Sequence, residues 1–64
     1  MTTKEEMYMK CLLIEAFVKS VVINGTTDNA TLVSMVDETF HPETDEEMEA
    51  YSEAIIYAKY SVLN

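Results

Sequence analysis

Gly25 and Pro42 are the only glycine and the only proline in this chain of 64 residues, and they divide it into three segments. Glycine can adopt the left-handed conformation that closes a helix. A proline disfavours the helical conformation in the residue before it. We therefore expect one helix to end at Asn24 and a second to end near Phe40.

Helix-capping residues stand at the start of each segment. Thr3 and Thr44 each precede a glutamate by three residues, which is the capping-box pattern, and Thr27 or Asp28 can cap the middle segment. The sequence thus predicts an all-α fold in a single domain, residues 1–64. The predicted small three-helix unit consists of helices over about 3–24, 29–40 and 44–63.

Apolar residues recur three and four residues apart, which aligns them on one face of each helix. The predicted core residues are Met7, Cys11, Ile14, Val18 and Val21, then Leu32, Val33, Val36 and Phe40, then Met48, Tyr51, Ile55, Ala58 and Val62. Other apolar residues fall outside these stripes: Leu12, Leu13, Ala16, Phe17 and Ile23 in the first helix, and Ile56, Tyr60 and Leu63 in the last. We therefore expect a homodimer in which the first and third helices supply most of the shared surface.

A β-hairpin is the alternative for residues 21–36. Val21 to Ile23 and Leu32-Val33 favour strands, and Asn24-Gly25 is a strong turn signal. A two-residue turn there would pair an apolar strand with the polar residues 26–28, which is an unfavourable register. A longer loop would avoid this conflict, so the hairpin remains an alternative.

Charge is unevenly distributed along the chain. Residues 37–53 contain eight of the twelve acidic residues and no lysine or arginine, whereas the remainder has four acids and four lysines. The resulting field repels nucleic acid and anionic membranes and attracts basic surfaces. We expect a protein partner with a basic surface, such as a host nucleic-acid-binding protein or enzyme, with no direct binding to nucleic acid or membrane.

Part of this acidic block has a structural explanation. Residues 45–47 fall in the first turn of the last helix, where carboxylates complement the helix dipole. Asp37 and Glu38 instead lie near the end of the middle helix, and Glu49 and Glu53 are like charges one turn apart, so these four oppose local stability. Such residues suggest a binding role, although the block could also serve only solubility.

Tyrosines extend the candidate binding surface. Tyr57 and Tyr60 lie outside the core stripe and near Glu53 and Ile56, and tyrosine beside carboxylates is typical of interface centres. Packing at a dimer seam or on the first helix is the alternative for these rings. The predicted partner-binding residues are Asp37, Glu38, Glu46, Glu49, Glu53, Ile56, Tyr57 and Tyr60.

Catalysis and metal binding have little support in the sequence. One cysteine and one histidine can make neither an intrachain disulfide nor a tetrahedral zinc site, and there is no phosphate loop or nucleophile with an identifiable base. Glu38 and His41 have the Glu-x-x-His spacing of di-iron bundles, but His41 lies at a helix end beside Pro42. We expect no enzyme activity, no cofactor and no metal.

These features favour a small acidic protein-binding module, acting as an inhibitor or a nucleic-acid-mimicking decoy that occupies a basic site on a host protein. In size and charge the chain resembles small acidic proteins that bacteriophages and mobile elements use against host polymerases, nucleases or defence enzymes. The alternative is a non-catalytic helical adaptor or self-assembling regulator that acts through hydrophobic helix faces. The apolar run 11–23 contains Glu15 and Lys19 and is too short to span a bilayer, so we expect a cytoplasmic protein.

Overall fold

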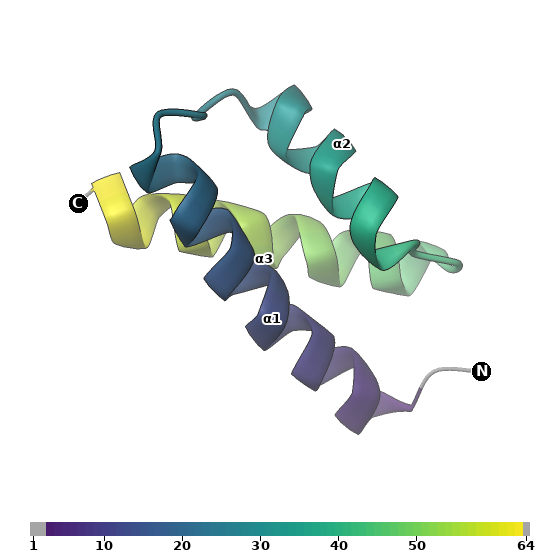
Figure 1. Cartoon of the computed structure of the whole chain (residues 1–64). Coiled ribbons are helices and arrows are strands. Elements are labelled where there is room, and N and C mark those ends of the chain that lie inside the picture. Colours follow the sequence, from purple (N-terminus) through teal and green to yellow (C-terminus); the bar gives the residue numbers. More distant parts are fainter. Residues whose placement is uncertain (1–2, 64) are drawn as a thin grey trace.

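The computed structural model describes residues 3–63 and contains three helices (Figure 1). They are α1 (Lys4–Ile23), α2 (Asn29–Phe40) and α3 (Asp45–Leu63). The all-α prediction is therefore confirmed. Within residues 3–63 no segment forms a strand, so the hairpin alternative for residues 21–36 is wrong.

Side-chain caps start all three helices. Thr3 and Thr44 each accept a hydrogen bond of 3.1 Å from the backbone N–H three residues later. At the start of α2 the carboxylate of Asp28, rather than the hydroxyl of Thr27, accepts a 3.0 Å bond from the N–H of Thr31. Because each cap binds an amide that lacks a partner within the helix, these local contacts determine where the helices begin.

Gly25 closes α1 in the predicted way. Its φ is +109°, and its N–H donates to the carbonyl of Val22 at 3.0 Å while the N–H of Thr26 donates to that of Val21 at 3.2 Å. This pair of bonds is a Schellman motif, which requires a left-handed residue after the helix. The chain therefore leaves α1 at a defined angle and enters the short loop before α2.

His41 ends α2 in a conformation that the sequence did not indicate. Pro42 disfavours the right-handed helical conformation in the residue before it, and His41 has φ 50° and ψ 68°, in the left-handed region. Its N–H still donates to the carbonyl of Asp37 at 3.0 Å, which completes the last turn of α2. The chain then turns sharply into α3.

The hydrophobic core lies between α1 and α3, which pack on each other more extensively than either packs on α2 (Figure 1). Its buried residues are Ile14, Val18, Val22, Leu32, Val36, Tyr51, Ala54, Ile55 and Ala58. Phe17 and Phe40 join α1 to α2 through an edge-to-face contact with centroids 6.3 Å apart. The core therefore draws on every helix.

Some predicted core residues lie elsewhere. Val33 and Met48 are exposed, whereas Val21 is half-buried and packs against the core beside Val22, which is buried but was not in the predicted stripe. The short helix α2 makes limited contact with α3, so the flanks of α2 and α3 stay uncovered. A three-and-four spacing identifies the helix face but not how wide the covered part of that face is.

The molecule is elongated, with dimensions of 34 × 18 × 15 Å. One end contains the start of α1 and the connection from α2 to α3, and the other contains the α1–α2 loop and the last turn of α3 (Figure 1). This arrangement determines which charges come together.

Candidate interaction surface

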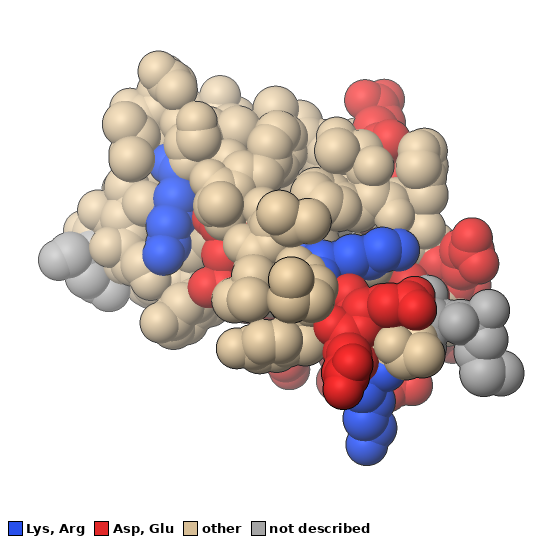
Figure 2. All heavy atoms as spheres, turned by 60° about the horizontal axis from the view of Figure 1, so that its bottom comes forward, with Lys and Arg blue, Asp and Glu red and all other residues tan. Residues whose placement is uncertain are grey.

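Acidic residues gather at one end of the molecule. We define the acidic end as residues 3–6 and 37–49, which are the start of α1, the last turn of α2, the connecting loop and the first turns of α3. It contains nine of the twelve carboxylates but only one of the four lysines, Lys4, whereas the rest has three of each. By this division the acidic end has the whole net charge of −8, and Figure 2 shows most of the red side chains on one side of the view, with blue side chains among them.

The sequence did not indicate that Glu5 and Glu6 belong to this end. They are separated from residue 37 by more than thirty residues along the chain, and the stretch that contains them is neutral as a whole. The packing of α1 on α3 brings its first turn beside the start of α3, because Thr3 and Lys4 line the same cleft as Glu43 and Glu46. No local sequence signal could have revealed this.

Glu47 is an exception among the acids because its side chain is buried. It is only 4% exposed, and its carboxylate accepts hydrogen bonds from Tyr51 Oη at 3.2 Å and from Thr44 Oγ1 at 3.3 Å. Burial, followed by this bond and the nearby charge of Glu47, raises the pKa of Tyr51 to about 12. Glu47 therefore has a structural role, and the four-residue spacing of Glu47 and Tyr51 was the available sequence signal.

The predicted binding residues of α3 share one face. Glu46, Glu49, Glu53, Ile56, Tyr57 and Tyr60 are all exposed. With 3.6 residues per turn they fall within roughly a third of the helix circumference, opposite the buried side chains of Tyr51, Ile55 and Ala58. We call this set the α3 outer face. It is acidic near the start of the helix and apolar and aromatic toward its end.

Asp37 and Glu38 are also exposed but belong to α2. The four-residue connection from α2 to α3 keeps them at the acidic end, together with Glu46 and Glu49. The eight predicted residues therefore form two groups, one along the α3 outer face and one at the end of α2.

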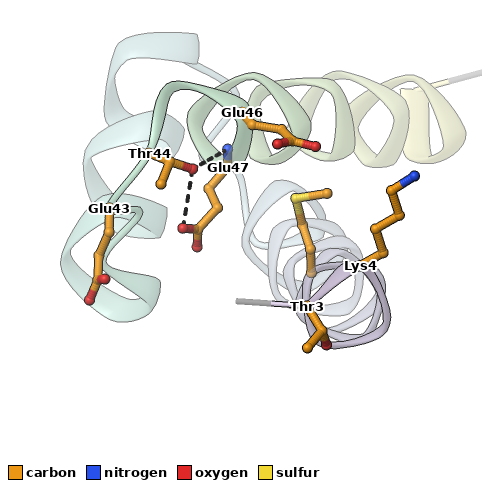
Figure 3. A pocket seen from close by; sticks show the side chains of 7 residues that line it. Thr3, Lys4, Glu43, Thr44, Glu46 and Glu47 are labelled. Carbon is orange, nitrogen blue, oxygen red and sulfur yellow. Dashed lines mark hydrogen bonds between the residues drawn. The ribbon is translucent and has the colours of Figure 1, made fainter. Parts of the chain in front are cut away.

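A small open cleft lies between the first turn of α1 and the start of α3 (Figure 3). It has a volume of about 330 Å³ and is lined by Thr3, Lys4, Met7, Glu43, Thr44, Glu46 and Glu47. In Figure 3 the side chains of Lys4 and Glu46 extend from opposite helices on the same side of the cleft, whereas Glu43 points away. One cation among carboxylates gives the acidic end a single positive position.

Cys11 helps to join α1 to α3. Its thiol is half-buried and donates a weak hydrogen bond to the carbonyl of Ala50 at 3.8 Å. Burial and the nearby charges of Glu15 and Glu53 raise the pKa of this thiol. Because the thiolate is the nucleophilic form, this environment favours an unreactive packing role.

Within the described residues, no three histidine, cysteine or acidic side chains come together in a way that could hold a metal ion. Over the same range, no helix combines the length and hydrophobicity that crossing a bilayer requires. The chain matches no protein-family model, no curated protein and no solved structure.

Proposed function

We propose that this protein is a non-catalytic acidic binding module that occupies the basic site of another protein, as an inhibitor or a nucleic-acid-mimicking decoy of the phage or mobile-element type. The observation that carries this proposal is the separation of charge: the net charge of −8 is concentrated at one end. In such a complex, carboxylates replace the phosphates that the basic site normally binds.

The α3 outer face supports the same proposal. Its carboxylates attract a basic partner at a distance, and Ile56, Tyr57 and Tyr60, each more than half exposed, supply apolar contact area next to them. Charge alone gives a fast but weak encounter, whereas buried aromatic side chains usually provide most of the binding energy. The combination suits a partner that presents basic residues around an apolar depression.

The proposal also includes a homodimer that works in the cytoplasm. A chain of this size buries a smaller fraction of its surface on folding than a larger domain does, and a second copy is one of the few ways to gain stability without a disulfide. The lone half-buried thiol of Cys11 is compatible with a reducing compartment.

The test compares two variants that change the net charge equally. Glu49→Gln with Glu53→Gln removes two charges from the α3 outer face, and Asn24→Lys with Thr27→Lys adds two positive charges at the exposed α1–α2 loop. Both have a net charge of −6. Immobilised wild-type protein is used to capture partners from lysate at low salt, and the captured protein is identified and purified for measurements of its dissociation constant with each variant.

We expect the double variant Glu49→Gln/Glu53→Gln to weaken binding at least about tenfold. The double variant Asn24→Lys/Thr27→Lys should change binding by less than threefold, since charges in the contact matter more than the total charge. Binding should also weaken steeply as salt rises from 0.1 to 1 M, because the screening length falls from about 10 to 3 Å. Double-stranded DNA should displace the partner if its site binds nucleic acid. Equal effects of the two pairs, or binding that is insensitive to salt, would contradict the proposal.

A further inference from the structure

The outward side of α1 is an apolar face that neither α2 nor α3 covers. It lies opposite the buried residues Ile14 and Val18. Six exposed side chains make up this face, which we call the α1 outer face: Met9, Leu12, Leu13, Ala16, Ser20 and Ile23. Met9 and Leu13 are each 59% exposed and Ile23 is 71% exposed. Exposed apolar residues are common singly, but a continuous row of them marks an interaction site.

The size order of these residues restricts what can cover them. The central ridge is formed by Met9, Leu13, Ala16 and Ser20, with spacings of four, three and four residues. The spacing is the same when read in either direction, whereas the sizes run from large to small. A two-fold axis between Leu13 and Ala16 therefore sets Met9 against Ser20 of a second copy, and Leu13 against Ala16.

We propose that the α1 outer face is the seam of an antiparallel homodimer in which the large half of each ridge packs on the small half of the other. This inference rests on the homodimer of the proposed function but not on the basic partner. Packing large side chains against small ones lets two helices interdigitate without voids. A parallel pair would instead set Met9 against Met9 and leave a gap between the small residues.

Charge favours the same orientation. In the antiparallel pair the two acidic ends lie at opposite ends of the dimer, and each molecule is 34 Å long. The start of α1 at each acidic end then faces residues 23–26 of the second copy, which carry no charge. In a parallel pair the two ends, which together carry the full charge of both copies, would lie side by side within about one screening length of 10 Å. Their repulsion therefore selects the antiparallel arrangement.

The molecule has enough surface to accommodate a second copy. The chain exposes 4495 Å², which is close to the roughly 4,200 Å² expected for a compact monomer of 7.3 kDa. A standard interface takes about 800 Å² from each partner, which is less than a fifth of this surface. The second copy leaves the α3 outer face free, because α1 and α3 pack on each other and their outer faces point away from that contact.

Sedimentation equilibrium of the full chain tests the seam. Leu13→Gln should raise the dimer dissociation constant at least about thirtyfold, since each substitution removes two buried leucines from a two-fold interface. The matched control is Ile56→Gln on the α3 outer face, which should leave the constant unchanged. Both side chains are more than half exposed, so neither change should unfold the monomer.

Thiol cross-linking tests the orientation. In a Cys11→Ser background, Met9→Cys and Ser20→Cys proteins are treated with a short bis-maleimide, separately and as a mixture. We expect covalent dimer only in the mixture, because equivalent positions of the two copies lie about 16 Å apart along an antiparallel pair.

The outcomes separate the two proposals. A monomer at every concentration overturns the homodimer itself. A dimer weakened by Ile56→Gln rather than Leu13→Gln, or cross-linked by either cysteine variant alone, overturns this seam while leaving the homodimer in place. The dissociation constant for the basic partner, expressed per protomer, should be the same for Leu13→Gln and the wild type. A failure of the decoy function is therefore recognised independently of the dimer.

Discussion

Replacing Tyr51 with phenylalanine removes the hydroxyl that donates to the buried carboxylate of Glu47 and keeps the ring in the core. A hydrogen bond to a charged group contributes about 1.5–3 kcal/mol, and its loss leaves the carboxylate with a single side-chain donor, Thr44. A domain of this size has a total stability of roughly 3–10 kcal/mol. The substitution should therefore remove a large share of the free energy of unfolding and lower Tm by on the order of 10 °C.

Thermal and urea unfolding followed by circular dichroism measure this loss, at one protein concentration because a dimer makes Tm depend on concentration. Tyr57→Phe is the matched control, since the side chain of Tyr57 is 62% exposed and should tolerate the change within about 0.5 kcal/mol. If the Tyr51 and Tyr57 variants proved equally stable, the buried bond to Glu47 would have no energetic significance and the reasoning would be wrong.

Three further predictions concern titration, capping and the α1–α2 turn. The pKa of Tyr51 is raised from 10.0 to about 12, so the stability that its neutral hydroxyl contributes is complete below pH 10 and is lost as the pH rises to 12. Absorbance at 295 nm should show one late tyrosine ionisation that the Tyr51→Phe variant lacks. Thr44→Ala should cost more in urea unfolding than Thr3→Ala, for which about 1 kcal/mol is expected, because Thr44 also donates to a buried carboxylate. Gly25→Ala should destabilise the protein by roughly 1–2 kcal/mol in the same assay, entirely through its φ of +109°, because a Cβ there would meet no atom within 4 Å.

The helix boundaries were predictable because their causes are local. Thr3, Thr44 and Gly25 each act within one turn of their own position, and the predicted helices agree with the structure to within one residue at each end. The face of α3 that carries the predicted binding residues was also predictable, since helical periodicity fixes relative directions once the helix is known.

Other features depend on contacts between segments distant in sequence. Glu47 is buried at the cleft that α1 forms with α3, and the addition of Glu5 and Glu6 to the acidic end requires the packing of α1 on α3. Val22 is more deeply buried than Val21, and the sequence could not show this because α1 is apolar around most of its circumference. Hydrophobic patterning then identifies the helix but not how it is rotated about its own axis relative to the core.

The separation of charge along the long axis gives each protomer a permanent electric dipole, and the two dipoles oppose each other in the antiparallel dimer. On a positively charged support, such as an anion-exchange resin, the dimer-disrupting Leu13→Gln variant should adsorb in one orientation, with the loop of residues 24–28 directed toward solution. A fluorophore attached at Thr27 should therefore remain accessible to a soluble quencher after adsorption, whereas one attached at Glu43 should be shielded by the support.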